Sequence, residues 1–365
     1  MVGNPFISKQ LIGRQSELSQ VSQILVQDGD LLLAGVPGIG RRTLIRAAAA
    51  QCKARVIEID CLRATDYGRF LQLLAEALLA TFDQDNAVAF IQQWSQDQPF
   101  TLKPSTTGQL TVVWHISPSK EWSLFEALLR LPQALAEWLD CRVVLVFQNF
   151  PHIRSWDRGS KWEQYLRQEI QRQTRVSYAL IATVAERWTK DADLKVIALA
   201  PLPDRDLRAW IVEAMALKDL MFDLETPALE LFLGYVQGHF GDAIALARRL
   251  WVDLLHSSHP ALQSKIQPHQ VYRSAIALVE DLSVTFESLI LLLPSSQVRV
   301  LESLALDPTD SPHAREYIQK HNLSRGGGLQ GALASLEQKG LVYGAEQGYR
   351  IALPLLAFWL KYRLG

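Results

Sequence analysis

A glycine-rich loop between a buried strand and a helix constrains this chain more than any other stretch. Residues 30–47 read DLLLAGVPGIGRRTLIRA, in which an apolar run is followed by three glycines and then by a helical pattern. A strand, a glycine turn and a helix in this order place backbone N–H groups at a helix N-terminus, where they can hold a phosphate. The stretch therefore predicts a phosphate-binding unit.

The loop fits the phosphate-loop frame G-x-x-x-x-G-K-[ST] in part. Arg41 stands at the lysine position and Arg42 at the hydroxyl position, with Thr43 one residue late. Arginine keeps the positive charge but lacks the compact ammonium of lysine, and it cannot ligate Mg²⁺. We expect ATP or ADP to bind with little role for Mg²⁺ and with slow hydrolysis. The predicted loop residues are Gly35, Val36, Pro37, Gly38, Ile39, Gly40, Arg41, Arg42 and Thr43.

Bulk properties point to a globular protein that acts without a membrane. A chain of 365 residues suggests two or three domains, and 37 basic against 38 acidic residues give no overall attraction to nucleic acid. The three cysteines lack metal-ligand spacing, so we expect reduced thiols and no metal site. The first ten residues lack a continuous apolar segment and no apolar run reaches about 20 residues, so we expect no signal peptide, no membrane span and a cytoplasmic protein.

Strands alternate with helices over residues 30–200, which predicts an α/β fold with a parallel sheet and the loop at its carboxyl edge. We assign residues 1–200 to this core, with an insertion near 83–123 that holds a helix and a strand at 110–115. The β-branched run at 142–147 suits a central strand. Gln148 and Asn149 follow it, where P-loop NTPases carry a metal-binding Asp and a catalytic Glu. Amides can neither neutralise Mg²⁺ nor accept a proton.

Three further side chains are weaker candidates. Asp60 ends the strand beside the loop strand and is the best substitute acid, ahead of Glu58 and Asp157. Thr183 stands at a strand end where P-loop ATPases sense the γ-phosphate. Arg187 is either an arginine finger acting within a homo-oligomer or a solvated loop arginine, and the second interpretation is favoured.

The remainder of the chain is predicted to be helical in two parts. Residues 201–282 form an all-α lid, with helices near 204–217, 225–236, 241–257 and 268–281. Arg248 and Arg249 on the third helix either reach a nucleotide phosphate or complement the helix dipole, and the dipole role is favoured. Residues 283–365 form a winged-helix domain, with helices near 284–293, 295–304, 313–321 and 329–339 and a hairpin pairing 341–343 with 349–351.

The predicted recognition helix at 329–339 carries few basic side chains for contacts with DNA phosphates. A role in packing or in binding a protein partner is therefore favoured over DNA binding, which stays an alternative. Strong salt dependence of DNA affinity would support that alternative.

Taken together, the motifs resemble the archaeal-type ATPases of the STAND branch, near the AAA+ and origin-recognition ATPases. The resemblance rests on NPF…GR..EL, LLLAGVPGIGRRTL, RVVLVFQNF, LPDRDLRAWI, GHFGDAIALARRLW and ALASLEQKGLVY…YRIALPLLAFWL, and it covers nearly the whole chain. It implies an ATPase core, a helical lid and a winged helix, with ATP as a conformational switch. It places Gly35, Gly40, Arg41 and Arg42 in the phosphate loop and Gln148 and Asn149 at the positions of the metal-binding and base acids.

The residues at positions 41, 42, 148 and 149 differ from those of active P-loop ATPases. These differences favour a protein that holds nucleotide as a regulatory switch or scaffold, with weak or no hydrolysis, and that acts through a protein partner. An ATPase that uses substitute acids and a winged-helix DNA-binding regulator are the alternatives.

Overall fold

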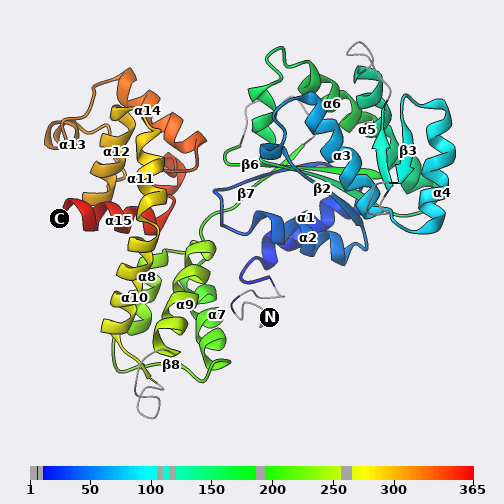
Figure 1. The fold of residues 1–365 in the computed structure, drawn as a ribbon. Coiled ribbons are helices and arrows are strands. Elements are labelled where there is room, and N and C mark those ends of the chain that lie inside the picture. Colours follow the sequence, from blue (N-terminus) through cyan, green and yellow to red (C-terminus); the bar gives the residue numbers. More distant parts are fainter. Residues whose placement is uncertain (1–5, 7–10, 105–109, 115–120, 186–193, 256–264) are drawn as a thin grey trace. The chain divides into compact units, whose positions relative to one another are not determined.

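A computed structural model describes residue 6 and residues 11–104, 110–114, 121–185, 194–255 and 265–365 (Figure 1). The chain forms two compact units. The sheet unit comprises residues 15–34 and 41–198, and the helical unit comprises residues 1–14, 35–40 and 199–365. The glycine-rich loop at 35–40 therefore belongs to the helical unit, whereas the strand before it and the helix after it belong to the sheet unit.

The sheet unit is built on a five-stranded parallel sheet, as the sequence predicts. Its strand order is β2-β5-β6-β1-β7, so two strands separate β2 from β1, and the prediction that Asp60 ends the strand beside the loop strand is wrong. The strands are β1 Leu31–Ala34, β2 Arg55–Asp60, β5 Val143–Gln148, β6 Val176–Ala182 and β7 Lys195–Ala198. Every residue of β1 and β6 is buried, which fits the continuous apolar runs typical of central parallel strands. Parallel registration sets Asp60 opposite Gln148, so these two side chains share the carboxyl edge.

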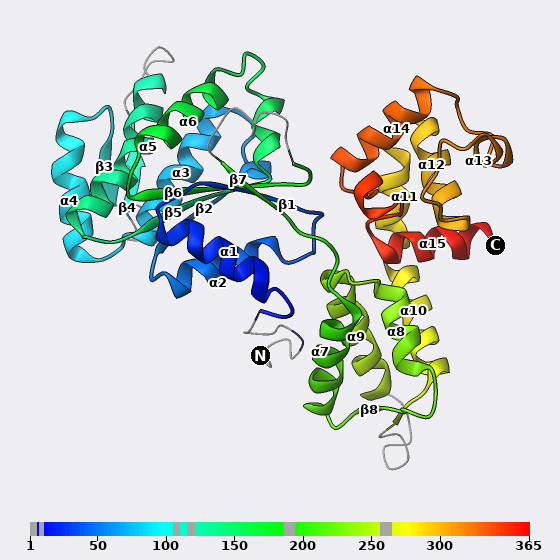
Figure 2. The same cartoon turned by 180° about the vertical axis from the view of Figure 1, so that it is seen from behind.

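Helices cover both faces of this sheet, as the two opposite views in Figures 1 and 2 agree. One face carries α1 Gln15–Val26 and α2 Arg41–Gln51. The other carries α3 Tyr67–Thr81, α5 Glu121–Trp138 and α6 Lys161–Arg172. Short 3-10 turns follow β2 and β5, namely η1 Cys61–Arg63 and η4 Phe150–Ser155. Phe70 of α3 stacks on Phe147 of β5, with ring centroids 5.9 Å apart, and so ties the second helical layer to the sheet.

The insertion between α3 and α5 contains more structure than the sequence indicates. Helix α4 Asp85–Trp94 and the turn η2 Ser95–Asp97 lead into an antiparallel pair, β3 Thr101–Pro104 and β4 Leu110–Val113. The strand expected at 110–115 is present as β4. Its partner β3 was missed, because TLKP is short, polar and ends in proline, a residue that does not indicate a strand.

The helical unit begins with four helices at the predicted places. They are α7 Asp204–Ala216, α8 Ala228–Val236, α9 Phe240–Leu255 and α10 Pro268–Asp281. Two dipeptides, β8 Met221–Phe222 and β9 Lys265–Ile266, pair in parallel and were not predicted. Phe6 is fully buried against this bundle, with its ring 6.0 Å from that of Trp251.

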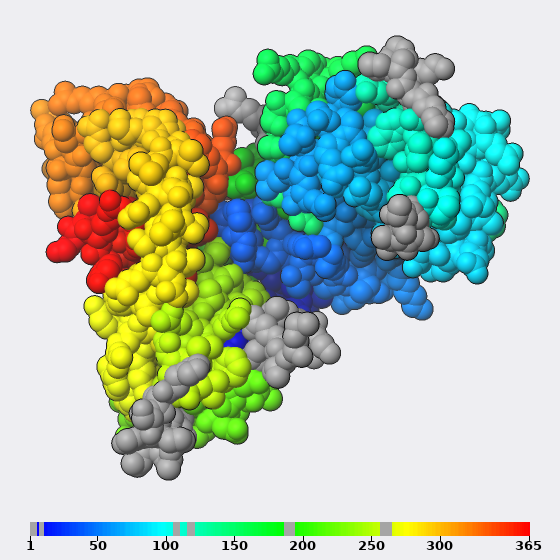
Figure 3. Space-filling view, viewed as in Figure 1, coloured from blue at the N-terminus to red at the C-terminus, as the bar shows by residue number. Residues whose placement is uncertain are grey.

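The C-terminal part of the helical unit contains the four predicted helices and a minimal wing. The helices are α11 Ser283–Leu291, α12 Ser295–Leu306, α13 Arg315–Lys320 and α14 Gly327–Gln338. The expected hairpin is reduced to a single antiparallel bridge, Val342 to Ile351, around the turn η6 Ala345–Gln347. A fifth helix, α15 Pro354–Leu364, was not predicted. Figure 3 shows α10 and α11 as a continuous exposed yellow band on this face.

Candidate functional site at the glycine-rich loop

The loop 35–40 leads from the end of β1 to the first residue of α2 through a backbone that requires glycine. Gly38 has φ +85° and Gly40 has φ +100°, in the region that residues with a Cβ rarely adopt. Val36 and Ile39 are buried and anchor the loop, whereas Pro37 and Gly38 are exposed. The first turn of α2 contains no acidic residue. The loop and helix start therefore keep the backbone features that a phosphate needs.

Within the helical unit, the carbonyl side of the loop is held by His239, which precedes α9, and by Gly241 in the first turn of α9. The Nε2 atom of His239 lies 2.7 Å from the Pro37 carbonyl, and the Gly241 N–H donates to the Gly38 carbonyl at 3.0 Å. A Cβ at Gly38 would lie 2.6 Å from the His239 ring, so the contact itself requires glycine. Sequence analysis did not identify His239, although the GHFGD break drew attention to this turn.

Arg14 is a second residue of the loop environment; the resemblance implies a place near the nucleotide base for Phe6 to Arg14. Arg14 is 4 % exposed, and its Nη2 donates to the Ala200 carbonyl at 2.5 Å and to the Ile39 carbonyl at 3.5 Å. Its guanidinium thus joins the end of the loop to the chain that follows β7.

The two arginines at the start of α2 have different environments. Arg41 donates from Nη1 to the Ala182 carbonyl at the end of β6, 2.9 Å away, and burial lowers the pKa of its guanidinium. Arg42 forms a bidentate pair with Glu58 of β2, with Nε–Oε1 at 2.6 Å and Nη2–Oε2 at 3.0 Å. Thr43 is exposed. Arg42, which stands where a hydroxyl would ligate Mg²⁺, thus pairs with a carboxylate instead.

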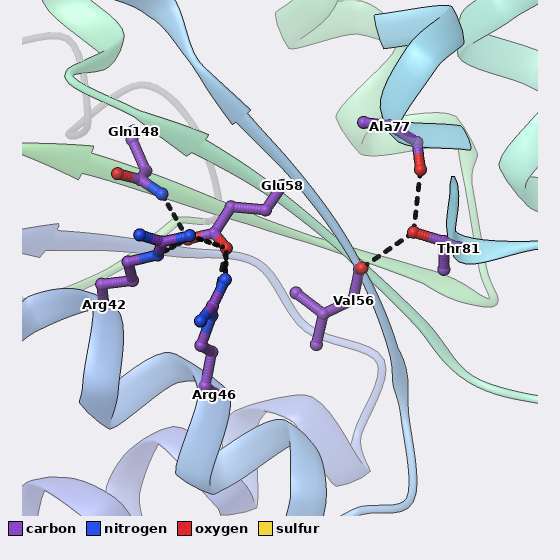
Figure 4. A network of polar contacts seen from close by, with 7 residues as sticks. All are labelled: Arg42, Arg46, Val56, Glu58, Ala77, Thr81 and Gln148. Carbon is purple, nitrogen blue, oxygen red and sulfur yellow. Dashed lines mark hydrogen bonds and ion pairs between the residues drawn. The ribbon is translucent and has the colours of Figure 1, made fainter. Parts of the chain in front are cut away.

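Glu58 is the centre of this polar cluster (Figure 4). Arg46, one turn after Arg42, also pairs with Glu58, and the Gln148 amide donates to the same carboxylate. The Glu58 side chain is 12 % exposed, whereas those of Arg42 and Arg46 are 56 % and 53 % exposed. Two guanidinium groups and an amide thus surround the carboxylate, which leaves little place for a divalent cation.

The second carboxylate at the sheet edge, Asp60, is also engaged. Its Oδ1 accepts from the Leu62 N–H at 3.1 Å, which caps η1, and from the Asn149 amide at 2.9 Å. Asn149 adopts the left-handed conformation, with φ +52°. Amides from β5 therefore contact acids from β2. Among the described residues, no group of three His, Cys, Asp or Glu side chains could hold a metal ion.

The remaining candidates lie apart from this cluster or have other contacts. Thr183 is half-buried directly after β6, and Arg187 lies outside the described residues. Asp157 accepts from the N–H groups of Lys161 and Glu163, both at 3.0 Å, and so caps the start of α6.

On the lid, Arg249 pairs with Asp253 at 2.8 Å and also with Asp281, whereas Arg248 is exposed. These ion pairs give Arg249 a structural role within the helical unit.

Comparison with known proteins agrees with this architecture. Residues 10–181 match the family model described as AAA ATPase domain, and residues 284–362 match the one described as probable winged helix domain. No curated protein matches the chain.

Two solved structures share the fold over nearly the whole chain. The Walker-type ATPase of Pyrococcus abyssi is 16 % identical, with a TM-score of 0.66 and 96 % of each chain covered. The ORC1 protein of Aeropyrum pernix, solved in complex with DNA, is 14 % identical, with a TM-score of 0.52, and the match covers 98 % of this chain and 95 % of that protein.

No helix within the described ranges is long and apolar enough to cross a membrane. The predicted architecture, a P-loop NTPase core with a parallel sheet followed by helices and a winged helix, is confirmed. The chain therefore contains an AAA ATPase domain at residues 10–181 and a C-terminal winged helix domain at residues 284–362.

Proposed function

We propose that this protein is a STAND-like regulatory switch or scaffold that holds ATP or ADP on the loop 35–40 and at the start of α2, with weak or no hydrolysis. The loop supports binding because it combines left-handed glycines with the N–H groups of a helix start. The proposed domains are residues 1–200 for the core, 201–282 for the lid and 283–365 for the winged helix.

The pairing of Glu58 with Arg42 and Arg46 is the observation that carries this proposal. Phosphoryl transfer normally relies on a metal ion that bridges phosphates and on a group that activates the nucleophile. Here a guanidinium stands in the hydroxyl position, and the nearby carboxylate is already neutralised by two positive charges. The residues present therefore do not fit Mg²⁺.

An active ATPase with a substitute acid is less well supported. Asp60 accepts hydrogen bonds from a backbone N–H and from Asn149, and Glu58 is enclosed by cationic partners. A general base must be free to accept a proton from the attacking water. These contacts hold both carboxylates as hydrogen-bond acceptors for the protein itself.

A protein partner suits the winged helix better than DNA. On α14 and just after it, Ser335 and Lys339 both bond to Gln297 of α12, with Lys339 Nζ 2.7 Å from its Oε1. A recognition helix that reads DNA needs such polar groups free for phosphates or base edges. This internal bonding favours the partner-binding interpretation.

Calorimetric titration of the purified chain with ATP and ADP, with and without Mg²⁺, tests the proposal. We expect binding that is unchanged by Mg²⁺ and no release of inorganic phosphate. Arg41→Ala should weaken binding by removing a cation at the loop, whereas the matched control Arg69→Ala, a half-buried arginine of α3 paired with Glu76, should not. Binding that requires Mg²⁺ and is followed by phosphate release would overturn it.

A further inference from the structure

We infer that His239 and Asp242 form a relay that couples the conformation of the phosphate loop to the docking of α15 in the winged-helix domain. This inference rests on the proposed function for its ligand, but its contacts all lie within the helical unit. The relay runs from the Pro37 carbonyl through the His239 ring and the Asp242 carboxylate to the Leu355 N–H.

The first step of the relay fixes two neighbouring peptide planes of the loop. The carbonyls of Pro37 and Gly38 are held by His239 Nε2 and by the Gly241 N–H. In a planar trans peptide, the N–H points opposite to the carbonyl. Holding these two carbonyls therefore directs the N–H groups of Gly38 and Ile39 away from His239. His239 and the first turn of α9 thus orient the loop donors before any phosphate arrives.

The middle step is the contact between His239 and Asp242. The Nδ1 atom lies 3.1 Å from the Asp242 backbone nitrogen and 3.0 Å from its Oδ1. Burial lowers the pKa of His239, but the hydrogen bond and negative charge of Asp242 raise it more, with a further contribution from the Pro37 carbonyl, so the net shift is upward. In either protonation state, Nδ1 has a partner on Asp242: the backbone N–H when neutral and the carboxylate when protonated.

The last step replaces a missing helix cap. Helix α15 begins after Leu353, whose side chain cannot accept a hydrogen bond, and its first turn contains no acid. Asp242 supplies the acceptor from another helix, because its Oδ2 takes the Leu355 N–H at 3.0 Å. A carboxylate at a helix N-terminus satisfies an otherwise unpaired N–H and complements the helix dipole. The cap of α15 therefore depends on the residue that orients His239.

Hydrogen exchange of the full chain, followed by mass spectrometry without any nucleotide, tests the relay directly. His239→Ala should speed exchange at the Gly241 and Leu355 amides, each by about 2- to 12-fold, as expected for the loss of one hydrogen bond. Asp242→Ala removes the acceptor of the Leu355 N–H itself, so it gives the largest increase in exchange expected at that amide. His321→Ala is the matched control, because His321 also pairs with an aspartate, Asp307, at 2.9 Å but lies outside the relay.

Unchanged exchange at Leu355 in His239→Ala, while Asp242→Ala increases it, would overturn the relay. Should His239→Ala speed exchange throughout α7 as well, the helical unit has loosened as a whole, and His239→Gln is measured instead. Its amide can still donate to Pro37 but has no group at the Nδ1 position. We then expect Gly241 to stay protected and Leu355 to exchange faster; equal protection at both amides would refute the coupling.

The same measurement repeated with ADP distinguishes a failure of this inference from a failure of the proposed function. ADP should slow exchange at Leu355 in the unmodified chain but not in His239→Ala. If the unmodified chain binds no nucleotide, the proposed function fails, whereas the ligand-free measurements still decide the relay. If it binds nucleotide while the ligand-free His239→Ala leaves Leu355 unchanged, the relay fails and nucleotide binding stands.

Discussion

Replacing Glu58 by Gln should increase nucleotide affinity while it lowers stability. The carboxylate neutralises Arg42 and Arg46, so the substitution leaves one more uncompensated positive charge at the start of α2. For two phosphate charges at about 10 Å in a medium of effective dielectric constant about 40, Coulomb's law gives about 1.7 kcal/mol, or more than tenfold tighter binding. Because both guanidinium groups are more than half exposed, the lost ion pairs should cost only about 1–2 kcal/mol of folding free energy.

Calorimetry with ATP, combined with urea unfolding, measures both effects. Glu76→Gln is the matched control, since it makes the same charge change at an exposed pair in α3 and should leave ATP affinity unchanged. The increase in affinity should shrink as salt is raised, because exposed charges are screened. A Glu58→Gln chain that folds and binds ATP no more tightly than the unmodified protein would refute the view that Glu58 competes with phosphate for these arginines.

Three further predictions concern the core, the loop and the winged helix. Burial raises the pKa of Asp30 to about 7, against an opposing hydrogen bond from the Tyr178 N–H, so the native state keeps its proton to higher pH than the unfolded chain. Stability should therefore fall between about pH 4 and 7, by at most about 4 kcal/mol, and urea unfolding of Asp30→Asn should show this slope removed and greater stability at pH 8. Gly38→Ala should abolish nucleotide binding in calorimetry, because its Cβ meets the His239 ring at 2.6 Å; binding equal to that of the unmodified chain would contradict this. Fluorescence anisotropy should find weak DNA binding whose affinity changes little with salt, and a steep salt dependence would count against a protein-binding winged helix.

The parallel sheet and the lid could be predicted because their signals are local. The buried runs at β1, β5 and β6 and the prolines near residue 203 mark elements in sequence alone, and all four lid helices lie where their patterns indicate. The glycine-rich turn can also be predicted, because its glycines indicate it locally, although His239 and Gly241 hold its carbonyls in place.

The features that were missed depend on residues far away in the chain. Helix α15 has no side-chain cap of its own and takes its cap from Asp242, so Pro354 at its first position is a weak start signal within the apolar run ALPLLAFWL. His239 contacts a carbonyl that lies 202 residues earlier. Arg46 acquires its role through Glu58, which no helical pattern within α2 indicates. Residue types thus indicate where a loop forms, whereas the distant residues that hold the loop in place leave no local signal.

The free energy that the relay can transmit limits how far nucleotide binding alone can shift the conformation of the winged helix. Two hydrogen bonds that differ between two states contribute about 1–3 kcal/mol, which changes an equilibrium by about 5- to 150-fold. Converting a 1:99 population into a 99:1 population requires about 10⁴-fold. The coupling through His239 and Asp242 therefore biases the winged helix rather than switching it completely. In the proposed switch, which lacks hydrolysis to reset the site, a protein partner that binds one state of the helical unit is the proposed source of the remaining free energy.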